Sequence, residues 1–220
     1  MRRKGVLAVF QAVVFDFDGT LVDTSEGIFR AVNYALQALG HPADPDEKSL
    51  ARMIGPAISD GFAQNYGVTD PAAVTKFREY YRARGVRQAA AYPGMGELLA
   101  ALQKQGVRLG IATIKPEPFA RTILERLGWL GRFDSLVGAP MDGSNNDKAS
   151  LIGQVLEQLG EPDRGRTAMV GDRASDVAGG RKNGLFTVYC GYGFGKSGEE
   201  READAAVHDV GELAALLLGQ

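Results

Sequence analysis

Residues that build disulfides and transition-metal sites are scarce in this sequence. Among its 220 residues it has one cysteine, Cys190, and two histidines, His41 and His208. A single cysteine cannot form an internal disulfide, which favours a reducing compartment over secretion. Both histidines lie far along the chain from the acidic motifs described below, so we do not expect a transition-metal site.

The sequence also has little net charge and no long apolar run. It carries 25 basic and 27 acidic residues, for a formal net charge of −2, so no overall field attracts nucleic acid or an acidic membrane. No stretch reaches the roughly 18 apolar residues of a membrane-spanning helix. Met1-Arg2-Arg3-Lys4 and the apolar run 6–15 resemble the start of a signal peptide, but no small-residue cleavage site follows. We expect a soluble cytoplasmic protein, either a monomer or a small homo-oligomer.

Short apolar runs alternate with helical periodicity through most of the chain. The runs are typical of buried parallel strands and lie at residues 12–15, 107–112, 133–137, 167–170 and 186–190. Segments with helical spacing lie at residues 116–127, 148–159, 174–183 and 212–218. This alternation predicts an α/β fold, a doubly wound parallel sheet with helices on both faces. Ligands of such sheets bind at the carboxyl ends of the strands.

One stretch departs from this alternation. From about residue 24 to residue 90 the apolar residues recur at helical spacing, as Ile28, Val32 and Leu36 do, and no convincing strand is found. Tyr92-Pro93-Gly94 then opens the next helix. The pattern predicts a Rossmann-like core made of residues 1–23 and 91–220, with an all-helical cap inserted at residues 24–90.

Four aspartates follow two of the predicted strands. Asp16 and Asp18 end the first strand two positions apart, so both side chains point to the same side. Asp172 and Asp176 follow the strand at 167–170 and share one face of a helix that begins near residue 173. Gathered carboxylates repel one another unless a cation or a proton offsets their charge. Because the ligands are oxygens without histidine or cysteine, the pattern favours Mg²⁺.

Each motif taken alone also has a simpler structural interpretation. Asp16 to Gly19 could be a turn at a strand end, and Gly171-Asp172 could be a turn followed by a helix cap. Thr113 could cap the next helix, and Lys148 alone is typical of a solvated lysine. The four motifs occur at four separate strand ends or loops of one series of strands and helices, which favours a shared site.

Together these motifs resemble those of the haloacid dehalogenase-like hydrolase superfamily. The first motif is Asp16-Phe17-Asp18-Gly19-Thr20-Leu21-Val22-Asp23, the second is Thr113, the third Lys148, and the fourth Gly171-Asp172-Arg173-Ala174-Ser175-Asp176. The predicted helices at 24–90 resemble the cap of the phosphoglycolate phosphatase-like branch. The resemblance implies a Mg²⁺-dependent phosphatase for a small phosphomonoester, of phosphoglycolate or nucleotide type, that acts through an aspartyl phosphate.

The resemblance also implies a role for each matching residue. Asp16 would be the nucleophile, and Asp18 would be the general acid and base. Thr113 and Lys148 would hold the phosphate oxygens. The ligands implied for Mg²⁺ are Asp16, the carbonyl of Asp18 and Asp172, with support from Asp176.

Two positions depart from the family pattern. Ile114 follows Thr113 where Asn or Ser is common, so the contact of residue 114 with phosphate is left to its backbone N–H. Ala149 follows Lys148 where Pro is common, and this leaves Lys115 as an alternative phosphate-binding lysine. The cap is expected to select the substrate. Its candidates are Arg52, which could equally be a solvated surface charge, and the segment 54–56.

Two other functions share this chemistry. A sugar-phosphate mutase also forms an aspartyl phosphate, but the mutases that the sequence resembles carry a histidine soon after the first motif, and none lies between Leu21 and Gly40. A phospho-acceptor signalling module uses an acidic cluster with Thr and Lys on a similar sheet. The helical insertion and the Gly19-Thr20 pair argue against it.

Overall fold

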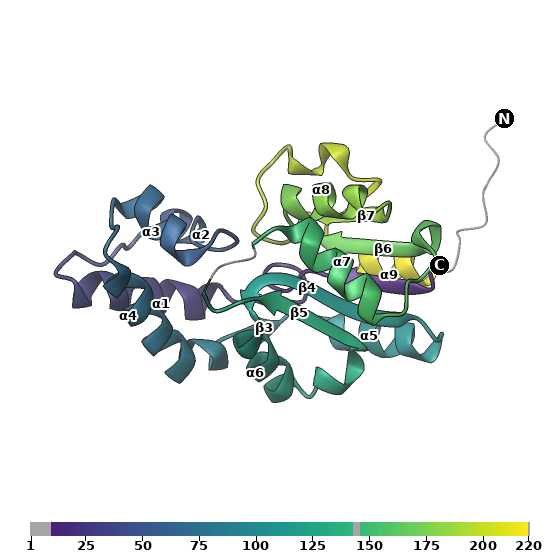
Figure 1. Cartoon of the computed structure of the whole chain (residues 1–220), viewed down its shortest axis with the longest axis horizontal. Helices are drawn as coiled ribbons and strands as arrows, with labels where there is room; N and C mark the ends of the chain where they lie inside the picture. Colours follow the sequence, from purple (N-terminus) through teal and green to yellow (C-terminus); the bar gives the residue numbers. More distant parts are fainter. Residues whose placement is uncertain (1–9, 143–145, 220) are drawn as a thin grey trace.

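A computed structural model describes residues 10–142 and 146–219 of the chain. Its centre is a six-stranded sheet in the order β5-β4-β1-β6-β7-β8 (Figure 1). Every neighbouring pair of strands in this sheet is parallel. The strands are β1 (Ala12–Phe15), β4 (Arg108–Pro116), β5 (Ser135–Ala139), β6 (Thr167–Gly171), β7 (Phe186–Cys190) and β8 (Ala205–Val207). The predicted α/β fold class is confirmed, while residues 1–9, including the start of the apolar run 6–15, lie outside the described residues.

Strand β1 shows why the sheet needs helices on both faces. All four of its residues are buried, and successive side chains enter opposite cores. Val13 and Phe15 pack on the side of α5 (Met95–Lys104), α6 (Glu117–Leu127) and α9 (Val210–Leu218). Ala12 and Val14 pack with the apolar face of α7 (Lys148–Gln158), and α8 (Ala174–Lys182) lies next to α7. A continuous apolar run is therefore the signature of this central strand.

A group of helices is inserted between two very short strands. The chain leaves the core at β2 (Val22–Asp23) and returns at β3 (Ala90–Ala91), which pair antiparallel. The intervening elements, called the helical insertion below, are α1 (Ser25–Ala38), α2 (Glu47–Ala51), α3 (Ile58–Tyr66), α4 (Pro71–Ala83) and the 3₁₀ helix η1 (Gly85–Arg87). The expectation of no strand up to residue 90 was wrong for Ala90, because a two-residue strand carries no readable alternation.

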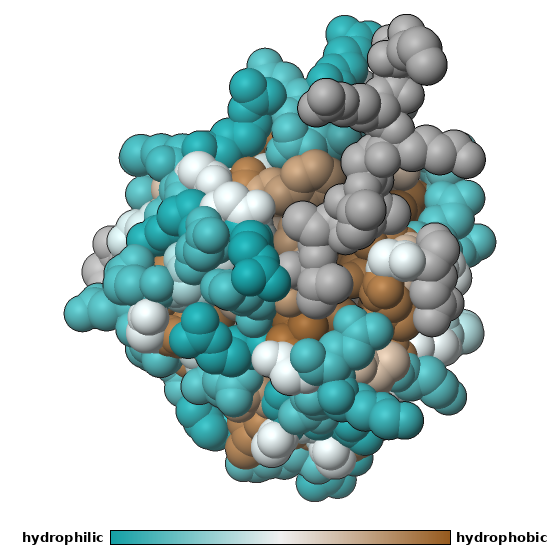
Figure 2. Space-filling view, turned by 90° about the vertical axis from the view of Figure 1, so that its right-hand side faces the viewer, coloured by the Kyte–Doolittle hydropathy of each residue, from teal (hydrophilic) through white to brown (hydrophobic). Residues whose placement is uncertain are grey.

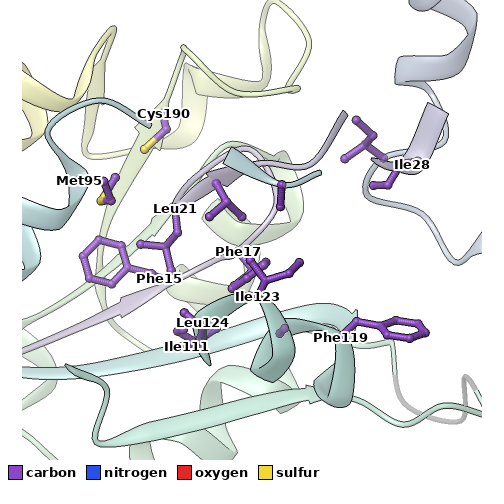
Figure 3. Close-up of a cluster of buried hydrophobic side chains, with 14 of the residues drawn as sticks. Phe15, Phe17, Leu21, Ile28, Met95, Ile111, Phe119, Ile123, Leu124 and Cys190 are labelled. Atoms are coloured by element: carbon purple, nitrogen blue, oxygen red, sulfur yellow. The ribbon is translucent and has the colours of Figure 1, made fainter. Parts of the chain in front are cut away.

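One apolar core runs from the sheet into the helical insertion. In Figure 3 Phe17 lies beside Ile123 of α6 and Phe15 lies toward Met95 of α5, while Ile28 of α1 continues the cluster. The insertion lies at the left of Figure 1, and Figure 2 views the opposite end of the molecule. Hydrophilic side chains cover much of that end, with apolar ones gathered near its middle. Within the described residues, no helix is long and apolar enough to cross a membrane.

The contact of α1 with η1 depends on a missing side chain. A Cβ atom at Gly27 would lie 2.4 Å from the carbonyl oxygen of Gly85, and a backbone atom cannot rotate away. We expect Gly27→Ala to lower the free energy of unfolding by about 1–3 kcal/mol, measured by urea denaturation.

Gly153 in α7 provides the matched control. A Cβ atom there would meet Asn183 Oδ1 at 3.6 Å, an ordinary contact. Gly153→Ala should therefore leave stability unchanged or raise it by up to about 1 kcal/mol, because alanine favours helix more than glycine does. If both variants changed stability alike, the predicted importance of the α1–η1 contact would be wrong.

Candidate active site

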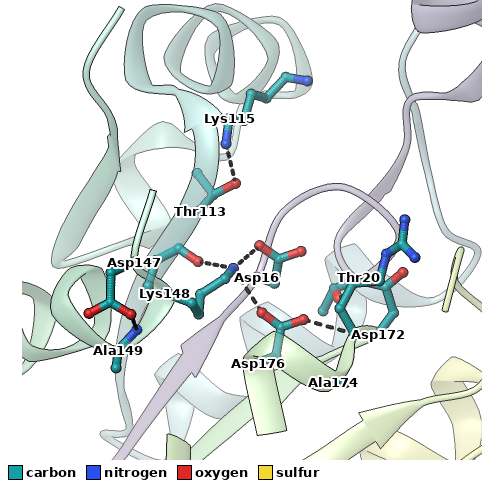
Figure 4. A network of polar contacts seen from close by, with 12 residues as sticks. Asp16, Thr20, Thr113, Lys115, Asp147, Lys148, Ala149, Asp172, Ala174 and Asp176 are labelled. Atoms are coloured by element: carbon teal, nitrogen blue, oxygen red, sulfur yellow. Dashed lines mark hydrogen bonds and ion pairs between the residues drawn. The ribbon is translucent and has the colours of Figure 1, made fainter. Parts of the chain in front are cut away.

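The acidic residues singled out in the sequence lie at the carboxyl ends of the central strands (Figure 4). Asp16 follows β1, and its backbone N–H donates to the Val170 carbonyl of β6 at 2.8 Å. Asp172 follows β6, and Asp176 lies in the first turn of α8. Lys148, the first residue of α7, enters the site from a fourth element. The parallel sheet thus brings together residues that are more than 150 positions apart.

Lys148 is the cation at the centre of this group. Its Nζ lies 2.5 Å from Asp16 Oδ1 and 2.8 Å from Asp176 Oδ1, and it donates to the Ala112 carbonyl at 2.9 Å. Burial disfavours its charge, but the two carboxylates outweigh burial and raise the pKa of Lys148 above its usual value. The lysine therefore stays charged and orients both aspartates.

Three carboxylates converge around this lysine. Asp16, Asp172 and Asp176 are all buried, and one oxygen from each lies within 4.8 Å of the others. Burial raises the pKa of Asp16 to about 7, against the lowering effect of Lys148, and raises that of Asp172 well above its ordinary value. A set of oxygen ligands with more negative than positive charge suits a divalent cation that prefers oxygen.

Hydrogen bonds and two glycines hold these carboxylates in place. Asp172 Oδ2 accepts from the Phe194 N–H at 2.7 Å, and Asp176 Oδ2 accepts from the Arg173 N–H at 3.0 Å, which caps α8. Gly19 has φ +85°, and a Cβ atom there would lie 2.3 Å from Asp172 Oδ2. A Cβ atom at Gly171 would likewise lie 2.3 Å from the Asp176 carboxyl carbon. Side chains at either position would push the cluster apart.

The Asp18 carboxylate has different partners from the other three. It accepts from Thr24 Oγ1 at 2.6 Å and from Lys115 Nζ at 2.9 and 3.2 Å, one contact to each of its oxygens. Burial opposes the charge of Lys115, but Asp18 and Tyr81 raise its pKa above the usual value. These donors engage the Asp18 carboxylate and leave its backbone carbonyl aside. The metal contact expected through that carbonyl stays a prediction.

The structure places both candidate lysines in the site, each on its own aspartate. Thr113 is buried, and its Oγ1 accepts from the Lys115 N–H at 3.1 Å. The alternative of Thr113 as a helix cap is wrong, since α6 begins after Pro116 without a side-chain cap. Ile114 lies beside Thr113 on the wall of the cleft described next.

A cleft of about 760 Å³ lies between the strand ends and the helical insertion. The described core residues that line it include Asp16, Asp18 and Lys148. The helical insertion contributes a wall that is mainly apolar and aromatic: Ile28, Met53, Ile58, Phe62, Val74, Phe77 and Tyr81. The site is therefore a charged floor facing a wall that is mostly apolar, with Asp60, Asp70 and Arg78 as its charged members.

Two arginines join the helical insertion to the core across this cleft. Arg78 of α4 donates to the Met141 carbonyl at 2.6 Å, and Arg173 donates to the Ile54 carbonyl. Both arginines line the cleft. An arginine on an amphipathic helix such as α4 is typically solvated, so the sequence does not single out Arg78. Only its spacing from Phe77 and Tyr81 on α4 could have suggested otherwise.

Arg52 requires a correction. It is exposed at the end of α2 and is not among the described residues that line the cleft. The neighbouring Met53 is buried and lines the cleft instead. A five-residue helix has too few residues to reveal which of two neighbours faces inward, so the sequence named the wrong one. Gly55 and Pro56 of the predicted segment do line the cleft.

The buried pair of Lys148 and Asp16 should be strongly coupled. We expect a double-mutant cycle of Lys148→Met and Asp16→Asn to give a coupling free energy above about 1 kcal/mol, because the two charges are buried and only 2.5 Å apart. Asp176 still contacts Lys148 when Asp16 is changed, so the coupling is that of one pair within a larger cluster. Urea unfolding in metal-free buffer measures it, at a pH above about 7 where Asp16 is ionised.

The exposed pair of Glu117 and Arg121, 2.7 Å apart on α6, is the control. Its coupling should not exceed about 0.5 kcal/mol, because solvent screens it. A buried pair coupled no more strongly than this one would contradict the role given to Lys148.

Comparisons with known proteins agree with this geometry. The family model described as haloacid dehalogenase-like hydrolase matches residues 13–190. A 5'-nucleotidase of Pseudomonas aeruginosa is 38% identical over 207 residues, which cover 93% of this chain and 92% of that protein. The tyrosine-protein kinase PtkA of Mycobacterium tuberculosis is 38% identical over 188 residues, which cover 85% of this chain. The match spans only 64% of the length of PtkA.

Comparison with solved structures leads to the same family. The crystal structure of a predicted phosphatase from Clostridium acetobutylicum matches with a TM-score of 0.88 and 33% identity, covering 97% of this chain and 100% of that chain. Phosphoglycolate phosphatases also match, which confirms the resemblance to that branch. The chain therefore belongs to the haloacid dehalogenase-like hydrolase family.

Proposed function

We propose that this chain is a Mg²⁺-dependent phosphatase that hydrolyses small phosphomonoesters through an aspartyl phosphate on Asp16. The observation that carries the proposal is the position of the Asp16 carboxylate, on the floor of the cleft and in contact with Lys148. Asp172 and Asp176 lie within 4.8 Å of it. A nucleophile, a fixed cation and a set of metal ligands thus meet at one point.

The metal ligands would be Asp16, Asp172 and the carbonyl of Asp18, with Asp176 in support. Their donor chemistry fits, because they offer buried oxygens whose negative charge Lys148 offsets only in part. When bound, Mg²⁺ supplies positive charge where the anionic phosphate meets the anionic carboxylate. This makes their approach possible in a buried site.

The reaction would proceed in two displacements at phosphorus. In the first, an oxygen of Asp16 attacks, the ester P–O bond breaks, and Asp18 in its protonated form gives the proton to the leaving oxygen. The ion pair of Asp18 with Lys115 corresponds to the ionised state that follows this transfer. In the second, water attacks the phosphorus of the aspartyl phosphate and gives a proton to Asp18, and the Asp16–phosphorus bond breaks. Inorganic phosphate leaves, and both aspartates return to their starting states.

Three groups would hold the transferring phosphoryl oxygens. Lys148 supplies charge next to Asp16. Thr113 and Ile114 line the same cleft and would contribute a hydroxyl and a backbone N–H. Such donors stabilise the transition state when they are fixed before the substrate arrives. Lys148 meets that condition through its three contacts.

The cleft favours a nucleoside monophosphate over phosphoglycolate. Ile58 and Val74, which line the cleft and are only partly buried, offer apolar surface to a large leaving group. Among the described insertion residues that line the cleft, Arg78 is the one cation, and it already donates to Met141. To bind a glycolate carboxylate or the second phosphate of a mutase substrate, the insertion side of the cleft would need more positive charge. The 5'-nucleotidase relative supports the same choice.

Phosphate release tests the function directly. We expect the wild type with Mg²⁺ to release phosphate from nucleoside monophosphates, with kcat/KM at least about tenfold above that for phosphoglycolate or glucose phosphates. Chelation of the metal should abolish release, and added Mg²⁺ should restore it. Asp16→Asn should lose at least about 1000-fold in kcat because the nucleophile is removed.

The same preparation of Asp16→Asn also reveals any contaminating phosphatase. Glu125→Gln, which alters an exposed carboxylate on α6, should behave as the wild type. Full activity in chelator or substantial turnover by Asp16→Asn would contradict the proposal.

A further inference from the structure

Lys115 is a buried lysine for which the proposed reaction supplies no role. Its Nζ donates to both oxygens of the Asp18 carboxylate, at 2.9 and 3.2 Å. Thr24 at the start of the helical insertion donates to one of the same oxygens at 2.6 Å. Two donors from different parts of the chain therefore set the orientation of this carboxylate.

An aromatic ring from the helical insertion lies against Lys115. The Nζ is 4.7 Å from the centre of the Tyr81 ring and 5.9 Å from that of Phe17. A ring face at this distance attracts a cation, most strongly where water is excluded. Tyr81 is itself nearly inaccessible to solvent. The lysine is thus held between an aspartate on one side and aromatic faces on the other.

The Tyr81 ring is fixed by its own neighbours. It stacks on Phe77 with ring centres 5.5 Å apart, and Phe119 of α6 meets it edge-on at 5.3 Å. A Cβ atom at Gly85 would lie 2.5 Å from the ring, so only glycine leaves it room. The buried hydroxyl has no hydrogen-bond partner among the described residues. The contact that the geometry shows between Tyr81 and Lys115 is therefore made by the ring.

We propose that Lys115 is a positioning residue that orients Asp18 toward the leaving group, and that the Tyr81 ring holds Lys115 in that place. Lys148 already supplies the charge at Asp16, so the two lysines serve different aspartates. The inference rests on the proposed function, because it assigns Lys115 a part in the proton transfer by Asp18. It also makes an insertion residue part of the catalytic geometry.

If Lys115 positions Asp18, a change at Lys115 should lower the rate of ester cleavage more for some substrates than for others. A poor leaving group such as an alkoxide needs the proton of Asp18 as its ester bond breaks, whereas dinitrophenolate leaves without one. A misplaced Asp18 carboxyl group should therefore slow the cleavage of alkyl esters far more than that of activated aryl esters. Loss of a group that holds phosphoryl oxygens would slow all esters alike.

The test compares kcat/KM for ethyl, phenyl and dinitrophenyl phosphate with Mg²⁺. This ratio reports the cleavage of the ester bond and excludes the later hydrolysis of the aspartyl phosphate, which is common to all substrates. We expect Lys115→Met to lose on the order of 100-fold on ethyl phosphate and only about threefold on dinitrophenyl phosphate. Asp18→Asn should show the same pattern with larger losses.

Further variants separate positioning from folding. Lys115→Arg keeps the charge and should recover part of the loss on ethyl phosphate. Tyr81→Leu removes the ring face and should shift the leaving-group dependence in the direction of Lys115→Met. Tyr81→Phe keeps the ring and should retain the wild-type dependence. Near-wild-type rates on dinitrophenyl phosphate show at the same time that each variant is folded.

Three results would overturn the proposal. Equal losses of Lys115→Met on all esters would make Lys115 a phosphate-holding residue or a purely structural one. If Tyr81→Phe showed the same leaving-group dependence as Tyr81→Leu, the Tyr81 ring would not be what holds Lys115 in place. If the wild type released no phosphate, or Asp18→Asn lost equally on all esters, the proposed function itself would fail, and the role of Lys115 would fail with it.

Discussion

The gathering of three buried carboxylates, two of them paired with one ammonium group, is the constraint on which the site depends. Buried charges of one sign are costly unless a partner offsets them, and Lys148 contacts Asp16 and Asp176 while Asp172 relies on backbone and hydroxyl donors. The parallel sheet makes this possible, since β1 and β6 are neighbours and end at the same edge. Glycines at 19 and 171 leave the space that the carboxylates occupy.

The floor of the cleft divides its charge between two aspartates that are two positions apart. Asp16 is paired with Lys148 from α7, and Asp18 with Lys115 from the end of β4. The first pair belongs to the core alone. The second touches the helical insertion through Thr24 and Tyr81. Such a division suits a reaction in which one carboxylate forms a bond to phosphorus and the other moves a proton.

Much of the core could be predicted from the sequence, because central strands and amphipathic helices leave strong periodic signals. The acidic positions could be found as well, since a parallel sheet aligns its strand ends whatever the details of packing. The short strands β2, β3 and β8 carry too few residues for such a signal. Which insertion side chains face the cleft was also beyond reach: Arg78 and Tyr81 line it and Arg52 does not, because the packing of the insertion on the core decides this.

The central claim, a covalent phosphoryl intermediate on Asp16, is tested most directly by the stereochemistry of hydrolysis. A thiophosphate ester made chiral at phosphorus with one oxygen isotope would be hydrolysed in water that carries another. Two successive in-line displacements invert the configuration twice, so the account predicts inorganic thiophosphate with net retention. Net inversion would mean that water attacks the ester directly and would contradict the account.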